Sequence, residues 1–380
     1  MFSRNRASRA VFGRREVIII SHSNSTHDYR TVIAGAGPAG IMAALEASKR
    51  GDVLLLDSNA LPRDKSCGGM LNEYAQEFLS QFAEVPGELI SGPSHVNFRY
   101  WDWDRDIKKA TGLRFLNVDR KGFDDWMVSL LPDNVEVRGS HAVTGFRQDE
   151  HGVTVNLKNG SMDTVRCDHL VGADGARSAV RRSLGGSNIA TYVTLQDFVK
   201  LEGEYPAFFD CIYMRGVGDC YAYAYVVPKG DVAIVGSVYY PKTKRPHEKH
   251  DQQLEVLRRA LPMLGETVKR EASVALYVRG TGDVVPGFGR VLLAGEAGGF
   301  MSPTSGEGIS YAMNSGLLAG RAIAAADDGA AFDLYRRNTA HIAANIKRKL
   351  KWLPFMESDW GKYLAGYVPA PLVSRVTKGL

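Results

Sequence analysis

The hydrophobic positions of residues 29–57 predict a strand, a helix and a second strand, in that order. A β-branched run occupies 29–34, and apolar residues then recur at helical spacing over 38–47. Basic residues and a glycine end this helix, and a second apolar run over 53–56 stops at Asp57. A strand, a helix and a strand in succession are typical of a parallel sheet in an α/β fold.

The same patterns divide the rest of the chain. Four short strands between residues 135 and 167 are separated by turn residues and predict a meander. Residues 198–240 have the short alternating runs of an antiparallel sheet, in which three tyrosines at period two share one face. Helices are predicted over 71–82, 119–131, 309–325 and 333–353, strands over 96–116, 135–137, 142–148, 152–157, 161–167, 169–172 and 291–296, and the tyrosines are Tyr221, Tyr223 and Tyr225.

Three strand-to-helix junctions place glycines and acids where a ligand can approach the backbone. In the first, Gly35, Gly37 and Gly40 permit a tight turn beneath a pyrophosphate, which the N-terminus of the helix favours. Asp57 follows about 20 residues later, where a ribose hydroxyl is bound. The other junctions are 169–182, with Ala-Asp-Gly at its turn, and 291–308, which is rich in glycine. Together they predict a dinucleotide-binding protein.

Two loops are predicted to face the cofactor. Residues 61–70 leave the carboxyl end of the second strand and contain Cys67, which is either a reactive thiol or a small packed hydrophobe. In the last junction, Thr304 and Glu307 have the spacing of a capping box, so the helix over 309–325 is predicted to point its positive end at the loop.

Composition describes an ordinary globular protein and excludes some partners. Of 380 residues, 44% are hydrophobic and 23% are charged. The net charge of +5 suits an anionic cofactor or an acidic membrane surface, but it is too small and too dispersed to predict nucleic-acid binding. No apolar run approaches the ~20 residues that span a bilayer, so any membrane contact is expected to be peripheral. The basic helical segment 335–355, which Pro354 is predicted to end, is either a solvated helix or such a contact.

The cysteines predict a reducing compartment, and we expect a cytoplasmic protein. Cys67, Cys167, Cys211 and Cys220 have neither metal-ligand nor CxxC spacing, so no metal is expected. A turn at 215–219 would place Cys220 opposite Met214 and not opposite Cys211, so four thiols are expected.

The three junction motifs together resemble the FAD-dependent family typified by para-hydroxybenzoate hydroxylase. They are GxGxxG at 35–40, GADGxxSxVR at 172–181 and GEAGGFxxPxxGEG at 295–308. Within that superfamily, Lys-Ser-Cys-Gly-Gly at 65–69 and Tyr-Ala-Tyr-Val-Val-Pro at 223–228 resemble the geranylgeranyl reductase branch, as do the basic C-terminal helices.

This resemblance implies FAD and assigns residues to it. Departures from the family pattern are Glu296 in place of Asp, Gly299 in place of a His common in hydroxylases, and Tyr225 in place of Trp. The implied cofactor-binding residues are Gly35, Gly37, Pro38, Ala39, Gly40, Asp57, Ser58, Cys67, Gly68, Gly69, Arg120, Asp174, Gly295, Glu296, Gly306, Glu307 and Gly308, and the candidate catalytic residues are Cys67, Tyr223 and Tyr225.

The resemblance also implies a division into domains. We expect a Rossmann-like FAD-binding domain, an antiparallel β-sheet substrate domain and C-terminal helices. The expected segments are a disordered arm at 1–28, a discontinuous FAD-binding domain at 29–192 and 278–330, part of 85–118 contributing to the substrate sheet, the substrate domain at 193–277 and the helical region at 331–380.

The leading functional hypothesis is reduction of a C=C bond in an isoprenoid or similar apolar substrate by hydride from FADH2, with NAD(P)H or a reduced ferredoxin as electron donor. The alternative is a monooxygenase, or less favoured a halogenase, that acts on an aromatic or peptidyl-tryptophan substrate through a C4a-hydroperoxyflavin. In a third hypothesis, the protein is a flavin-bound carrier that docks a partner through the basic C-terminal helix. The tyrosines at 221, 223 and 225 would pack against helices or line the substrate pocket.

Overall fold

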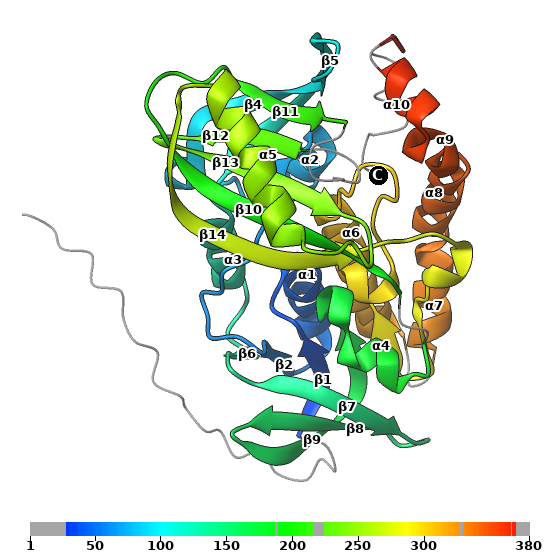
Figure 1. The fold of residues 1–380 in the computed structure, drawn as a ribbon. Coiled ribbons are helices and arrows are strands. Elements are labelled where there is room, and N and C mark those ends of the chain that lie inside the picture. Colours follow the sequence, from blue (N-terminus) through cyan, green and yellow to red (C-terminus); the bar gives the residue numbers. More distant parts are fainter. Residues whose placement is uncertain (1–27, 187–188, 216–223, 327–329, 366, 370–380) are drawn as a thin grey trace, which may run out of the picture.

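The computed structural model describes residues 28–186, 189–215, 224–326, 330–365 and 367–369. Two β-sheets lie one above the other, and helices fill the space between and beside them (Figure 1). The expected arm at 1–28 lies outside the described residues except for its last one, and Cys220, Tyr221 and Tyr223 lie outside them too. The predicted α/β class, with a Rossmann-like sheet, a second sheet and C-terminal helices, is confirmed.

The first sheet is built around β1, which pairs in parallel with β2 on one side and with β9 on the other. β16 continues the parallel pairing beyond β9, and β6 continues it beyond β2. The carboxyl ends of β1, β9 and β16 therefore share one edge, which is where ligands bind in such sheets. The strands are β1 (Tyr29–Ala34), β2 (Val53–Leu56), β6 (Val135–Arg138), β7 (Ala142–Gln148), β8 (Val153–Asn159), β9 (Ser161–Gly172), β15 (Gly287–Phe288) and β16 (Val291–Leu293).

Both faces of this sheet are covered. Ile33 of β1 packs into a helical layer that includes α1 (Pro38–Ala47) and α6 (Ile309–Ala325). Its neighbour Val32 packs on the other face, against residues of β8 and β9. Because each face is buried there, β1, β2 and β16 contain short, continuous apolar runs in the sequence.

Helix α6 packs directly against α1. A Cβ at Gly316 would lie 2.0 Å from the carbonyl oxygen of Ala39, and one at Gly320 would lie 2.4 Å from that of Ala43. Larger residues would therefore separate the helices. Gly316 lies by Ala39 and Gly320, one turn later, lies by Ala43, so the two helices run in the same direction. Both N-termini point toward the region between the sheets (Figure 1).

The second sheet is mixed. Its strand order is β14-β10-β13-β12-β11-β4-β5-β3, and its pairs are antiparallel except β11 with β4. Helix α5 (Pro246–Ala260) packs on β10, β13 and β14 (Figure 1). The strands are β3 (Met70–Leu71), β4 (Ile90–Asp102), β5 (Ile107–Val118), β10 (Thr191–Leu201), β11 (Phe208–Tyr213), β12 (Ala224–Lys229), β13 (Val232–Tyr239) and β14 (Leu264–Leu276).

The C-terminal helices form a column beside both sheets, from the level of the first sheet up to the second (Figure 1). None of the described helices combines the length and the apolar character that crossing a bilayer requires. The remaining helices are α2 (Glu73–Ser80), α3 (Arg120–Ser129), α4 (Ala179–Ser183), α7 (Ala331–Asn338), α8 (Ala340–Leu350), α9 (Leu353–Glu357) and α10 (Asp359–Ala365).

The predicted meander is wrong in its first strand. β6 pairs in parallel with β2, with Val135 opposite Val53, so it belongs to the edge of the parallel sheet. The crossover through α3 explains this, because parallel neighbours need a long connection. The strand predicted at 161–167 and the one at 169–172 are a single strand, β9, which leaves the β7–β8 hairpin and enters the centre of the sheet.

Two helix-end predictions are also wrong. Gly308, not Thr304, is the N-cap of α6, because residues 302–307 form their own turn, in which the N–H of Gly306 donates to the oxygen of Ser302 at 3.1 Å. Pro354 does not end the basic helix. α8 ends at Leu350, and the proline lies in the first turn of α9, where no intrahelical N–H is needed.

Candidate active site

The first junction forms a tight turn that can accept a phosphate. A Cβ at Gly40 would lie 1.8 Å from the carbonyl oxygen of Gly35, so the turn closes only around glycine. Gly37 is the N-cap of α1 and offers no side-chain acceptor to the first N–H groups of the helix. The guanidinium of Arg63 covers the turn, since its Nη2 lies 2.7 Å from where a Cβ of Gly37 would be. The N–H groups and the cation together suit an anion.

Arg63 also links two predicted cofactor residues: it pairs with Asp57 directly and with Arg120 through Asp124. Its Nε lies 3.5 Å from Oδ2 of Asp57, and its Nη2 lies 2.8 Å from Oδ2 of Asp124. Arg120 reaches the other oxygen of Asp124 at 2.7 Å. Asp57 in turn accepts from the N–H of Ala36 at 3.0 Å. Ser58 follows it on the surface. The sequence analysis assigned no role to Arg63 or Asp124, because their pairing spans 61 residues.

The second junction leaves one carboxylate oxygen available. Oδ2 of Asp174 accepts from the N–H groups of Ala179 and Val180 at 2.7 and 3.2 Å, which fixes the start of α4. Oδ1 is buried and has no hydrogen-bond partner among the described residues. Burial raises the pKa of the Asp174 carboxyl. A hydroxyl of a bound cofactor is the kind of donor that this oxygen lacks.

The third junction lies beside the second and connects the two sheets. Its turn at Gly295–Gly298 contacts the turn at Gly175–Arg177. Glu296 reaches the end of β14, where its Oε2 accepts from the N–H of Leu276 at 3.0 Å. The N–H of Gly295 donates to Ser315 of α6 at 2.9 Å. The carboxylate of Glu296 therefore bonds to the second sheet, while the turn that carries it follows β16 of the first sheet and is held to α6.

Glu307, in the loop before α6, interacts electrostatically with the buried Lys349 of α8. Glu307 accepts from the N–H and the hydroxyl of Ser310 at 2.8 and 2.6 Å, and burial raises the pKa of its carboxyl. Lys349 of α8 donates to Ser302 at 3.3 Å and to the hydroxyl of Tyr311 at 3.1 Å. Burial lowers the pKa of Lys349 to about 8. The sequence analysis placed this lysine on a basic solvated helix, so its role here was missed.

A second lysine, which is half-buried, lies under the Cys-Gly-Gly loop. Nζ of Lys229 donates to the carbonyl oxygens of Val118 and Gly69 at 2.8 and 3.3 Å, and burial lowers its pKa to about 8. The N–H of Gly69 lies 3.5 Å from Sγ of Cys67. Arg120 interacts with the same sulfur. The loop is thus held by the last residue of β12, and two cations lie near its thiol.

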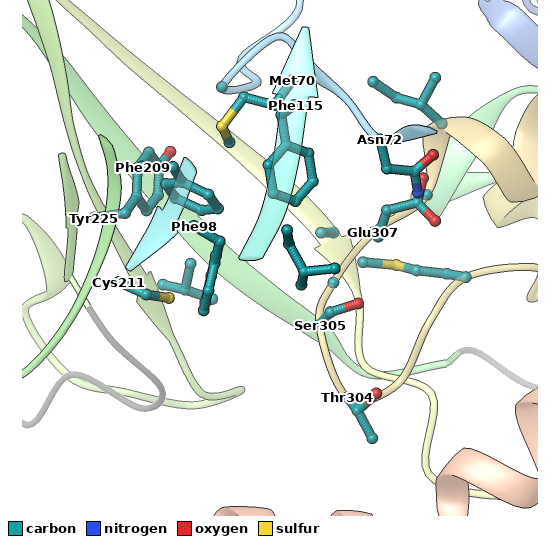
Figure 2. A pocket seen from close by; sticks show the side chains of 18 of the residues that line it. Met70, Asn72, Phe98, Phe115, Phe209, Cys211, Tyr225, Thr304, Ser305 and Glu307 are labelled. Carbon is teal, nitrogen blue, oxygen red and sulfur yellow. The ribbon is translucent and has the colours of Figure 1, made fainter. Parts of the chain in front are cut away.

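These two loops border a cavity of about 390 Å³ beneath the second sheet. Figure 2 shows Phe98, Phe209 and Tyr225 at one side of it, Thr304, Ser305 and Glu307 at the other, and Phe115 between them. Helices α9 and α10 contribute to the lining as well. The predicted site residues that line it are Cys67, Gly68, Gly69, Tyr225, Gly306, Glu307 and Gly308.

The other predicted cofactor residues do not line this cavity. Gly35 to Gly40, Asp57, Arg120, Asp174 and Glu296 belong to the junctions at the edge of the first sheet, whereas the third candidate catalytic residue, Tyr223, lies outside the described residues. The described residues hold no group of three or more His, Cys, Asp or Glu side chains that could bind a metal ion.

Hydrogen bonds link the wall of the cavity to the Cys-Gly-Gly loop. The hydroxyl of Tyr225 donates to Oε1 of Gln196 at 3.1 Å. The amide of Gln196 donates to Glu271 at 2.9 Å, and Ser66 donates to the same carboxylate oxygen at 3.0 Å. Gln196 and Glu271 face each other across β10 and β14, a pairing that the sequence alone did not reveal.

The residues present fit an elongated dinucleotide. The glycine turn and Arg63 suit a pyrophosphate, Asp57 suits a ribose, and the unpartnered oxygen of Asp174 suits a hydroxyl. The apolar cavity then begins at two loops that could hold a flat ring between them. We infer that the cofactor runs from the edge of the first sheet to the mouth of the cavity.

Comparisons with known proteins agree with this geometry. Residues 28–348 match the model of the family described as FAD binding domain. The chain is 30% identical over 298 residues to Protein CbrA from Escherichia coli (strain K12), which covers 76% of this chain and 82% of that protein. It is 29% identical over 334 residues to Protein CbrA from Escherichia coli (strain UTI89 / UPEC), which covers 85% and 87%.

Solved structures share the fold at lower identity. A geranylgeranyl bacteriochlorophyll reductase-like protein from Thermoplasma acidophilum superposes with a TM-score of 0.74 at 18% identity, covering 93% of this chain and 92% of that one. The flavin-dependent brominase Bmp2 gives a TM-score of 0.67 at 21% identity, covering 91% and 97%. The 2-methyl-3-hydroxypyridine-5-carboxylic acid oxygenase gives 0.61 at 18%, covering 91% and 95%.

Proposed function

We propose, since this chain belongs to the FAD binding domain family of flavoenzymes, that it is an FAD-dependent reductase. Its substrate would be an isoprenoid or a similar apolar molecule, in which it reduces one C=C bond. The observation that carries the proposal is the cavity, which is lined by aromatic and aliphatic side chains and bordered by the two loops that suit a flavin ring.

FAD, once reduced by NAD(P)H or a reduced ferredoxin, would supply a hydride to one carbon of the double bond. The chain then has three tasks: to hold the alkene against the ring, to exclude water and to give a proton to the other carbon. Phe98, Phe115 and Phe209 form the apolar wall that holds the alkene. The same wall would keep water from the reacting atoms. We propose that the main contribution of the protein to the reaction is to orient the alkene against the ring.

Cys67 and Tyr225 are the proposed proton donors, because both line the cavity and carry a transferable proton. Arg120 and Lys229 supply positive charge near the sulfur, where negative charge remains after a proton leaves. Tyr225 is oriented by its bond to Gln196. Tyr223, the third candidate, has the same chemistry in principle but lies outside the described residues.

A monooxygenase that acts on an aromatic or peptidyl substrate is the second candidate. The rings of Phe98, Phe115 and Phe209 meet edge to face, at 5.3 and 6.1 Å between centroids, and such a wall also suits an aromatic ring. A halogenase is a variant of this candidate that would show itself by dependence on chloride or bromide.

Product analysis under strictly anaerobic conditions distinguishes these functions. The FAD-loaded protein is reduced and mixed with prenyl alcohols of increasing chain length. The molecular masses of the products are then measured by mass spectrometry. The proposal predicts a product that is heavier by two hydrogens and needs no oxygen. If no alkene is reduced, and an aromatic substrate gains oxygen or a halogen only after air is admitted, the reductase proposal is wrong.

A further inference from the structure

The outer side of the last described helices exposes an unusual number of large hydrophobic side chains. Eight such side chains are exposed in the described part of the chain, and five of them lie between residues 352 and 367. We call these five the aromatic face. They are Trp352 (52% exposed), Phe355 (42%), Trp360 (73%), Leu364 (37%) and Tyr367 (57%). Single exposed hydrophobics need no explanation, but a group of this kind marks an interaction site.

Two rings of the aromatic face pack against a neighbouring ring, that of Tyr363. The ring of Trp360 meets that of Tyr363 at 5.8 Å between centroids, and Tyr363 meets Tyr367 at 5.6 Å. Gly361 lets α10 approach α9, because a Cβ there would lie 1.8 Å from the carbonyl oxygen of Phe355. The rings of Trp360 and Tyr367 therefore have packing partners before any docking partner arrives, which reduces the side-chain entropy that these two rings lose on docking.

Positive charge adjoins the aromatic face. Lys347, Arg348 and Lys351 are exposed in the last turn of α8 and just beyond it, within five residues of Trp352 along the chain. The two nearby carboxylates are already engaged: Glu357 accepts from Tyr277 at 3.1 Å and pairs with Arg279, and Asp359 accepts from Tyr213 at 3.4 Å. Exposed aromatic rings beside lysine and arginine are typical of proteins that lie on anionic lipid.

The same helices form part of the cavity wall. Leu353, Met356 and Ala365 line the cavity, whereas none of the five residues of the aromatic face does. α10 is attached to the second sheet by the hydroxyl of Tyr100, which donates to the carbonyl oxygen of Lys362 at 2.8 Å. One layer of helix therefore separates the aromatic face from the cavity.

We propose that the aromatic face docks on an anionic lipid bilayer, with the rings among the lipid headgroups and Lys347, Arg348 and Lys351 on the phosphates. A second copy of this chain fits less well, because a symmetric contact would bring the basic residues of both copies together. That the bilayer also supplies the substrate of the cavity rests on the proposed function; the docking itself does not.

Vesicle binding by the FAD-loaded protein tests this inference. Vesicles of phosphatidylcholine alone are compared with vesicles that also contain phosphatidylglycerol, and bound protein is measured by sedimentation. We expect binding to the anionic vesicles that weakens with salt. The F355S/W360S double variant should bind at least about tenfold more weakly, and the K347Q/R348Q/K351Q variant should lose the preference for anionic lipid.

The matched control is M162S/F288S, which removes hydrophobic side chains that are 69% and 66% exposed elsewhere on the molecule. It should bind as the parent protein does. The docking proposal is wrong if the parent ignores both vesicles, if F355S/W360S binds equally well, or if light scattering finds a dimer that this variant abolishes.

The docking proposal and the proposed function can be tested independently of each other. F355S/W360S should keep its FAD and its anaerobic turnover of a short, water-soluble alkene, since neither residue lines the cavity. Loss of vesicle binding with turnover intact supports docking whatever the natural substrate is. Vesicle binding without any alkene reduction would refute the reductase alone.

Discussion

The ring of Tyr225 lies across the backbone of Gly236 on the neighbouring strand, so close that a Cβ at Gly236 would come within 2.0 Å of Cζ of the ring. The two residues are directly paired between β12 and β13. This contact sets the position of the ring at the cavity wall, and the bond from its hydroxyl to Gln196 sets the orientation.

Gly236→Ala should therefore displace the ring of Tyr225 and impair substrate reduction. We expect turnover to fall by about tenfold or more, since a methyl group at this distance cannot be accommodated without moving the ring. FAD content, measured from the flavin absorbance, should not change. The matched control is Gly282→Ala, where a Cβ meets nothing within 4 Å. Equal turnover in both variants would show that the ring position is unimportant.

Arg63→Gln should weaken FAD binding. The change removes the cation over the glycine turn and leaves Asp57 and Asp124 without one of their partners. We expect the dissociation constant, measured by quenching of FAD fluorescence, to rise by about ten- to a hundredfold. Arg259→Gln on the exposed side of α5 is the control and should bind FAD as the parent does. Unchanged FAD affinity in Arg63→Gln would place the pyrophosphate elsewhere.

Lys349 should make stability depend on pH at the alkaline end. Burial lowers its pKa to about 8, from 10.5 for a free lysine. Between these values the unfolded chain binds more protons than the folded one, so the free energy of unfolding rises with pH. Below pH 8 Lys349 is protonated in both states, so the folded protein bears the full free-energy cost of burying its charge.

The variant Lys349→Met lacks this titration. Relative to the variant, the parent should gain about 2–3 kcal/mol between pH 8 and pH 10. Urea unfolding of both proteins across this range measures the difference. A difference that stays constant with pH would mean that Lys349 is charged in the folded protein throughout.

Cys67 should react with alkylating reagents faster while the flavin site is empty than while FAD is bound. Its side chain is partly exposed, whereas Cys167 is fully buried. Since the Cys-Gly-Gly loop is proposed to lie against the flavin ring, bound FAD should slow alkylation at Cys67 by about tenfold or more. Peptide mapping identifies the modified cysteine, and Cys67→Ser confirms the assignment. Alkylation of Cys67 at the same rate with and without FAD would move the ring away from this loop.

The local parts of the fold could be predicted from the sequence, but pairings between distant residues could not. The bounds predicted for β1, α1, β2 and α6 are those observed. Hydrophobic periodicity and glycine positions depend on residues that are close together in the sequence, so they predict local structure well. β6 was placed in the wrong part of the sheet, since two valines alternating with Glu136 and Arg138 do not reveal which strand they pair with.

The candidate site shows the same division. Cys67, Tyr225 and Glu307, chosen from local motifs, do meet at one cavity. Lys229 and Lys349 were missed, and Arg63 was expected only as one cation of a cofactor-facing loop, because a lysine or arginine is normally exposed. Their burial depends on carbonyl, hydroxyl and carboxylate partners that come from other elements.

The most direct test of the reductase proposal follows the flavin absorbance in a stopped-flow instrument. The FAD-loaded protein is reduced without oxygen and mixed either with a prenyl alkene in anaerobic buffer or with air-saturated buffer alone. Our account predicts that the alkene restores the oxidised flavin spectrum without oxygen, and that air restores it slowly in a single phase. A flavin that stays reduced with every alkene, together with a transient absorbing species that forms only with oxygen and is consumed by an aromatic substrate, would contradict it.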